Sequence, residues 1–117
     1  MDSAANNLLK RMKMTYTLGE IIAKRVFRLG ETSNNELTVL IGKPAQFPDS
    51  SDFYVPYQIS GTGRDSVRRV GGIDAIQCLQ LVMKGISAEL DRINRENNGL
   101  LRWEGDESGS LGFEPSS

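Results

Sequence analysis

One long stretch of the chain has a strong helical pattern, and it limits how the remaining segments can fold. Between Asp74 and Asn94 apolar residues recur at steps of three and four, which places them on one face of an α-helix. These residues are Ile76, Leu79, Met83, Ile86, Leu90 and Ile93. Asp74 stands three residues before Gln77, as in a capping box. Because such a helix must bury its apolar face, we expect a sheet of shorter segments to pack against it.

The other segments have the pattern of short strands separated by glycine, proline and polar turns. Residues 21–29 fit either a helix or a strand, and we interpret them as a strand, with Arg25 as the misfit on its apolar side. A polar connection then leads to a second strand, 37–41, as in a hairpin. The clearest alternation is in Phe53–Ser60, and Pro56 is expected at an edge or where no ladder hydrogen bond is needed. Short strands at 65–70 and 100–104 complete the set.

The order β-β-β-β-α-β predicts an α+β domain. We expect an antiparallel sheet of four to five strands with one long helix packed across one face. The predicted domain covers residues 18–104 and follows a flexible or short helical lead-in over 1–17. Residues 105–117 form an acidic tail rich in Gly and Ser, which Leu111 and Phe113 are expected to pin onto the body.

Composition narrows the classes of function. The 117 residues carry a net charge of -1, with 13 basic and 10 acidic residues up to Arg95 and 1 and 5 after it. This mildly basic body lacks the basic patch that nucleic-acid binding requires, so a nucleic-acid partner is not expected. No signal peptide or membrane span is visible, and a single cysteine fits a reducing compartment, so we predict a cytoplasmic protein with no membrane partner.

Catalytic and metal signatures are absent from the sequence. The chain has no histidine, which removes Ser-His and Cys-His catalysis and the commonest metal ligand. Cys78 lies in the middle of the predicted helix and is expected to be a packing residue. We therefore assign no catalytic residue, no metal site and no cofactor, although a hydrolase using carboxylates alone stays open.

Two surfaces are candidates for contact with another protein. The sheet face turned away from the helix would carry aromatic, arginine and other side chains of the kinds found at interfaces, namely Leu40, Tyr54, Pro56, Gln58 and Arg68. The helix carries a second stripe of mostly small residues, formed by Cys78, Leu81, Gly85 and Ala88. This stripe would dock a second copy or a partner helix, with Leu81 as the apolar anchor. Ordinary solvent-facing surface is the alternative interpretation of both, and the helix stripe could instead be covered within the chain.

Arg68 and Arg69 are also candidates for binding an anion. They precede Gly71 and Gly72 and lead directly to the start of the predicted helix, where free backbone amides favour negative charge. Against this hypothesis, Asp74 would already occupy those amides as the cap. A strand with solvated arginines is the competing interpretation.

Four motifs carry a resemblance to a known family. They are IGKP at 41–44, DFYVPYQI at 52–59, GGIDAIQCLQL at 71–81 and LRWEG at 101–105. Through them residues 21–114 resemble a widespread bacterial family of small proteins known only as a domain of unknown function. The resemblance implies a compact α+β domain of bacterial or phage origin, and it carries no activity and no functional residue across.

The sequence therefore favours a non-catalytic protein-binding module, for example an immunity-type or inhibitor protein of bacterial or phage origin. Its expected partner is another protein, and a homodimer through the helix stripe is a further hypothesis. The alternative is a regulatory domain that binds a small ligand or an anion through Arg68, Arg69 and the start of the helix.

Overall fold

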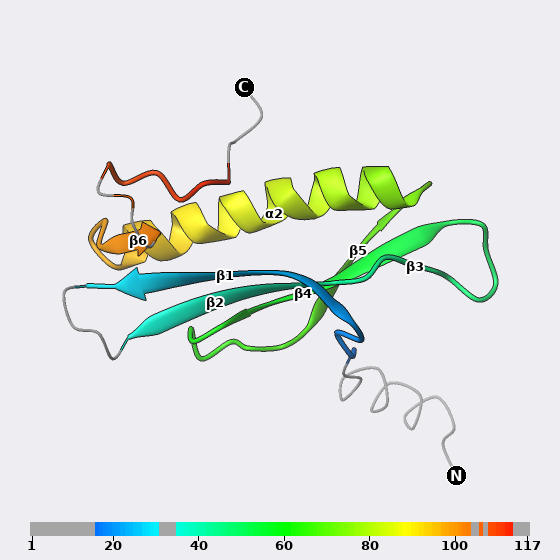
Figure 1. The fold of residues 1–117 in the computed structure, drawn as a ribbon, viewed down its shortest axis with the longest axis horizontal. Coiled ribbons are helices and arrows are strands. Elements are labelled where there is room, and N and C mark those ends of the chain that lie inside the picture. The colour runs from blue at the N-terminus through cyan, green and yellow to red at the C-terminus, as the bar shows by residue number, and fades with distance from the viewer. Residues whose placement is uncertain (1–15, 31–34, 104–105, 107, 114–117) are drawn as a thin grey trace, which may run out of the picture.

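One antiparallel sheet and a helix that lies across one of its faces make up the fold (Figure 1). The structure, a computed structural model, describes residues 16–30, 35–103, 106 and 108–113. The strands are β1 (Ile21–Leu29), β2 (Glu36–Gly42), β3 (Ala45–Gln46), β4 (Phe53–Ser60), β5 (Arg68–Gly72) and β6 (Leu101–Trp103), and the helix is α2 (Ala75–Glu96). This arrangement confirms the predicted α+β class.

The strands follow one another across the sheet until the helix interrupts them. β1, β2, β4 and β5 are neighbours in chain order, and β3 pairs with the start of β4. α2 then returns the chain to the opposite side of the sheet, where β6 pairs with β1. Pro56 lies between the residues of β4 that pair with β3 and those that pair with β2, so it interrupts neither ladder.

Local sequence determines where α2 begins and ends. The Asp74 carboxylate accepts a hydrogen bond from the Gln77 amide at 2.7 Å, and the Gln77 side chain accepts one from the Ile73 amide at 2.8 Å. Asp74 therefore caps the helix as predicted, whereas Gln77 reaches back to the amide of Ile73 instead of that of Asp74, a variant of the capping box. At the other end Asn98 has a φ of 58°, in the left-handed region where helices commonly stop.

The buried face of α2 differs from the predicted one. The prediction is correct for Ile86, Leu90 and Ile93, and Leu79 is partly buried against the core. Val82, at the margin of the same apolar arc, is also buried, as is Cys78. The prediction was wrong for Ile76 and Met83, which are 69% and 42% exposed. The reason is that α2 packs against β4 and β5. Only one side of the wide apolar arc of the helix therefore contacts the sheet, and the other side stays exposed.

The core lies between α2 and the sheet. The strands contribute Phe27, Leu37, Val39, Ile41, Val55, Tyr57, Ile59 and Leu101. The C-terminal segment closes this layer, because Leu111 is buried and the Ser87 hydroxyl donates to the Phe113 carbonyl at 2.9 Å. These contacts confirm that Leu111 and Phe113 hold the segment to the body. The predicted lead-in lies outside the described residues, except for Tyr16 and Thr17.

Candidate functional site

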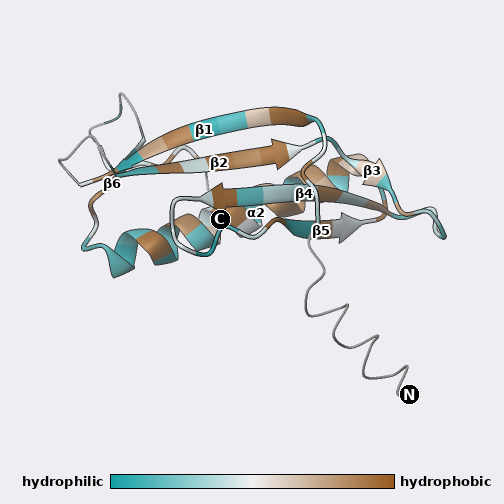
Figure 2. Cartoon of the chain, turned by 90° about the horizontal axis from the view of Figure 1, so that it is seen from below, coloured by the Kyte–Doolittle hydropathy of each residue, from teal (hydrophilic) through white to brown (hydrophobic). Residues whose placement is uncertain are grey.

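The outer edge of β1 is open over the first half of the strand. On that edge β6 pairs with Phe27, Arg28 and Leu29. Within the described residues, no strand pairs with the outer edge from Ile21 to Arg25. Figure 2 shows β1 at one side of the sheet, with a hydrophilic middle between more hydrophobic ends. An open strand edge offers a row of backbone donors and acceptors to another chain.

The hydrogen bonds at the end of β1 show which backbone groups point outward. The Leu29 amide donates to the Asn35 carbonyl toward β2 at 2.8 Å, whereas the Gly30 amide donates to the Leu100 carbonyl on the β6 side at 3.0 Å. Because directions alternate along a strand and the register is regular from Ala23 to Arg28, the even-numbered residues point outward. The Lys24 amide and carbonyl therefore face away from β2.

The described chain does not supply a backbone partner for Lys24. Arg28 pairs with Arg102, so a continued β6 would bring Asp106 opposite Lys24. Instead the Asp106 amide donates back to the Trp103 carbonyl at 3.0 Å, which turns the chain away from the edge. No group of the described residues therefore occupies the two backbone groups of Lys24, as pairing with a strand from another molecule would require.

A cavity of about 390 Å³ lies beside this open edge, on the helix side of the sheet. It is lined by Ala23, Lys24, Arg25, Val39, Ile41, Met83, Gly112 and Phe113. Val39 and Ile41 are core residues of β2, and the exposed Met83 side chain borders the cavity from α2. Because α2 packs over β4 and β5, this corner of the apolar sheet face remains only partly covered. The cavity can therefore receive an apolar side chain.

Arg25 places a positive charge at this cavity and holds one wall in place. Its guanidinium lies 3.9 Å from the centre of the Trp103 ring and 5.2 Å from that of Phe113, and it donates to the Gly112 carbonyl at 3.2 Å. No carboxylate of the described residues forms an ion pair with it. The sequence signal for this site was the charged Arg25 on an otherwise apolar strand face. Sequence analysis noted this misfit but did not predict a site there.

The predicted sheet-face site is placed on the side away from the helix, but its side chains are largely engaged within the chain. Tyr54 lies 4.8 Å from the Phe47 ring, and Pro56 is buried. The Gln58 side chain donates to the backbone carbonyl of Asp65, and Leu40 is half-buried opposite it. As an interaction surface this face stays a prediction.

The predicted position of Arg68 was wrong. Arg68 pairs with Tyr57, whose side chain is in the core, so Arg68 lies on the helix side of the sheet. Arg69 occupies the opposite face, with its guanidinium 4.1 Å from the Tyr54 ring centre and 4.2 Å from that of Tyr16. The two arginines therefore do not converge on one anion.

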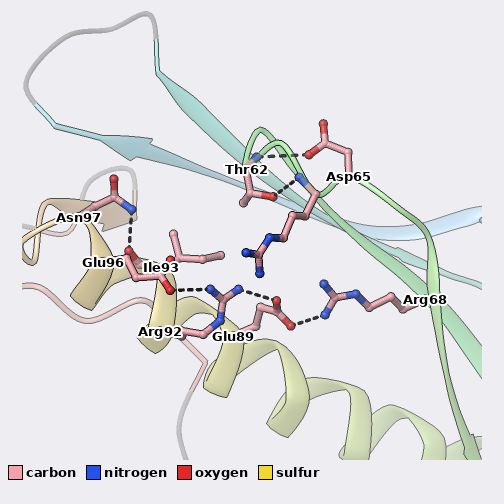
Figure 3. Close-up of polar contacts among 9 residues, drawn as sticks. Thr62, Asp65, Arg68, Glu89, Arg92, Ile93, Glu96 and Asn97 are labelled. Carbon is pink, nitrogen blue, oxygen red and sulfur yellow. Dashed lines mark hydrogen bonds and ion pairs between the residues drawn. The ribbon is translucent and has the colours of Figure 1, made fainter.

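Arg68 belongs to a network that ties β5 to α2 (Figure 3). It donates to Glu89, which also accepts from Arg92 at 2.9 Å, and Arg92 donates to Glu96 at 2.9 Å. Burial raises the pKa of the Glu89 carboxyl, but the hydrogen bonds and charges of Arg92 and Arg68 outweigh it. The net pKa of Glu89 is lowered from its ordinary value of 4.5.

This network gives a pH-dependent contribution to stability. Since the folded-state pKa of Glu89 is depressed, its stabilisation is complete above the unfolded-state pKa and is lost as pH falls through the folded-state value. We expect Glu89→Gln to lower the free energy of unfolding by about 1 kcal/mol at neutral pH and by much less at about pH 3. Urea denaturation of both proteins at the two pH values measures this, and an equal difference at both would contradict it.

The helix stripe is split between the core and the surface. Cys78 is fully buried, whereas Leu81 and Ala88 are exposed and Gly85 is half-buried. Burial raises the pKa of the Cys78 thiol, as expected of a packing residue. The three outer residues stay a predicted contact surface, because no partner chain is present to test them.

Gly85 provides a direct test of how closely other elements of the chain approach the stripe. A Cβ at this position would meet nothing within 4 Å. We therefore expect Gly85→Ala to raise the free energy of unfolding by about 0.5–1 kcal/mol, because alanine is the better helix former. A lower denaturation midpoint for Gly85→Ala would contradict the open space seen beside this glycine.

Within the residues that the structure describes, no three Cys, Asp or Glu side chains group together as metal ligands would. The same residues contain no helix that is long and apolar enough to cross a membrane.

Comparisons with known proteins identify the family. No curated protein and no solved structure matches the chain. One family model matches residues 23–115, a range that includes Lys24, Arg25 and the Phe113 wall of the cavity. The chain therefore belongs to the family described as Domain of unknown function (DUF6968).

Proposed function

We propose that this domain is a non-catalytic protein-binding module that takes an extended segment of its partner on the outer edge of β1. The observation that carries the proposal is the outward-facing amide and carbonyl of Lys24, which lack a partner in the described chain. Strand addition to an open sheet edge is a common mode of peptide recognition, in which backbone hydrogen bonds provide affinity and neighbouring pockets select side chains. The cavity beside Ala23 supplies such a pocket.

The exposed apolar side chains around the open β1 edge support a role in binding more than a role in catalysis. Ile21 and Ile22 are about half exposed, at 47% and 49%, and Met83 adds a further exposed apolar side chain beside the cavity. The alternative anion-binding function has less support, because Arg68 binds Glu89 and Arg69 stacks between two tyrosines. We also propose that the protein is an immunity-type or inhibitor protein of a bacterium or phage and that it acts in the cytoplasm. The sequence resemblance supports the origin, and the single cysteine supports the location.

The proposal predicts that one backbone donor is needed for partner binding. Lys24→Pro removes the outward amide while leaving the hydrogen bonds of β1 to β2, because proline is tolerated at edge positions that face solvent. We expect this variant to capture its partner at a level reduced by about tenfold or more, since at least one interchain hydrogen bond is lost and the approach of the strand is obstructed. Quantitative affinity capture from cells that express the protein natively measures the change.

Lys24→Ala is the matched control, because it removes the same side chain but keeps the amide. Leu81→Arg tests the helix stripe in the same experiment. Partners that are retained by Leu81→Arg and captured much less by Lys24→Pro than by Lys24→Ala would support the β1 edge. Full retention by a folded Lys24→Pro protein, or loss only with Leu81→Arg, would reject it in favour of another surface.

A further inference from the structure

We infer that the partner segment is acidic and extended, and that it inserts one apolar side chain into the cavity beside Arg25. This inference rests on the proposed function and specifies the class of segment that the β1 edge accepts. It combines three observations, namely the open backbone edge, the apolar cavity on one side of it and the local excess of positive charge.

The open edge requires that the segment be extended. A strand added next to β1 continues the antiparallel sheet and can use both backbone groups of Lys24. The usable length is limited, because β6 occupies the edge from Phe27 and the register of β1 shifts between Ile21 and Ala23. A short peptide strand fits this interval better than a long strand or a helix does.

The cavity requires an apolar side chain from that strand. Ala23 and Arg25 share the helix-facing side of β1 with Phe27, so an added strand projects alternate side chains to the same side. There the cavity opens beside the strand, with Val39 and Ile41 among its lining residues and Met83 and Phe113 among its borders. Its volume of about 390 Å³ can hold one large aliphatic or aromatic side chain.

The positive charge of the edge favours acidic residues at the positions of the partner segment that do not enter the cavity. β1 contains Lys24, Arg25 and Arg28 and no carboxylate, although the whole chain has a net charge of -1. Arg102 of β6 adds a fourth cation on the same edge. Among the described residues none of these four forms an ion pair, but Glu36 of β2 lies opposite Arg28. Lys24 pairs with the apolar Leu40 and is therefore the cation most available to a partner carboxylate.

The same charges disfavour a second copy of the chain at this edge. Antiparallel pairing of β1 with itself would place lysine and arginine side chains near those of the other copy, and like charges opposite one another destabilise a sheet. Edge cations are a known device against indiscriminate strand pairing. Here they leave the backbone open to a partner of opposite charge.

A displayed library of short random peptides, selected on the full-length protein, tests the inference. We expect the enriched peptides to combine Asp or Glu with one aliphatic or aromatic residue. Replacing Glu by Gln in a selected peptide should weaken its binding by about tenfold at low salt, and added salt should reduce the difference. Fluorescence anisotropy of the labelled peptides gives the dissociation constants.

Two protein variants locate the bound peptide. Ala23→Trp fills the cavity from an exposed position and should weaken binding by about tenfold or more, whereas Ala23→Ser should leave it nearly unchanged. Lys24→Pro should weaken binding more than Lys24→Ala does, because only proline removes the backbone donor. Circular dichroism of each variant confirms that a lost interaction is not a loss of folding.

The outcomes separate the inference from the proposed function. Peptides that are neutral or basic but sensitive to Lys24→Pro would overturn the acidic class and leave the binding edge standing. Peptides that are insensitive to both Lys24→Pro and Ala23→Trp would overturn the site itself, as would the absence of any enriched peptide. Light scattering that shows a dimer for the free protein and a folded monomer for Lys24→Pro would overturn the inference in favour of a second copy.

Discussion

Leu90→Ala is expected to lower the free energy of unfolding by about 2–5 kcal/mol, one of the two largest effects predicted for a single substitution in this chain. Leu90 is fully buried, at 0% exposure, where α2 packs on the sheet. Removing its branched side chain loses the transfer free energy of the buried groups and leaves a cavity that the neighbouring side chains fill only in part. For a domain of this size that loss is a large fraction of the total stability.

Met83→Ala is the matched control, because it truncates an apolar side chain of the same helix that the structure leaves exposed. Both residues belong to the apolar set that the sequence pattern predicts to be buried, but Met83 is 42% exposed beside the cavity. We expect Met83→Ala to cost less than about 1 kcal/mol. Urea or guanidinium denaturation of the two variants compares them, and equal losses would contradict the line of contact between α2 and the sheet.

Gly42→Ala is expected to destabilise the domain by about 1–3 kcal/mol or more, because there is no space for a methyl group at the end of β2. A Cβ on Gly42 would overlap the Leu18 carbonyl oxygen and would lie 2.7 Å from Cγ of Pro56. The neighbouring backbone is fixed, since the Lys43 amide donates to the Glu20 carbonyl at 2.8 Å. The strain cannot be relieved by turning one flexible side chain.

Gly71→Ala is the control for the Gly42 prediction. Gly71 also lies in a strand, but a Cβ there would make only ordinary contacts, the nearest at 3.7 Å to the Phe53 carbonyl oxygen. We expect this substitution to change the free energy of unfolding by no more than about 0.5 kcal/mol. Thermal and chemical denaturation of both variants test the difference, and a Gly42→Ala protein as stable as the parent would contradict the packing described around β2.

Periodicity and capping residues were sufficient to predict most of the fold. The alternation of Phe53–Ser60 and the Asp74 to Gln77 spacing are local features, and each gives the element that the structure contains. The helix face was harder to predict, because apolar residues cover a wide arc of α2 and only the crossing direction decides which side is buried. That direction depends on how α2 packs on β4 and β5, which the periodicity of the helix alone does not specify.

The candidate site could be predicted less well, since it depends on strand pairing. Arg68 was expected on the outer sheet face, but its pairing with Tyr57 turns it toward α2. A change of one residue in register moves a side chain to the other face of a sheet, and the sequence of β5 does not specify that register. The outer edge of β1 is open because β6, to which α2 returns the chain, has only three residues and pairs with only the end of β1. No local sequence pattern predicts that β6 is this short.

Amide hydrogen exchange, followed by NMR residue by residue, tests the open β1 edge most directly. In the free protein the Lys24 amide should exchange rapidly, whereas the amides of Arg25 and Phe27, which point toward β2, should be protected. Addition of a selected acidic peptide should then slow exchange at Lys24 without changing the protection of Arg25. A Lys24 amide that is already as protected as that of Arg25 in the free protein would contradict the account, because the edge would not be available to a partner.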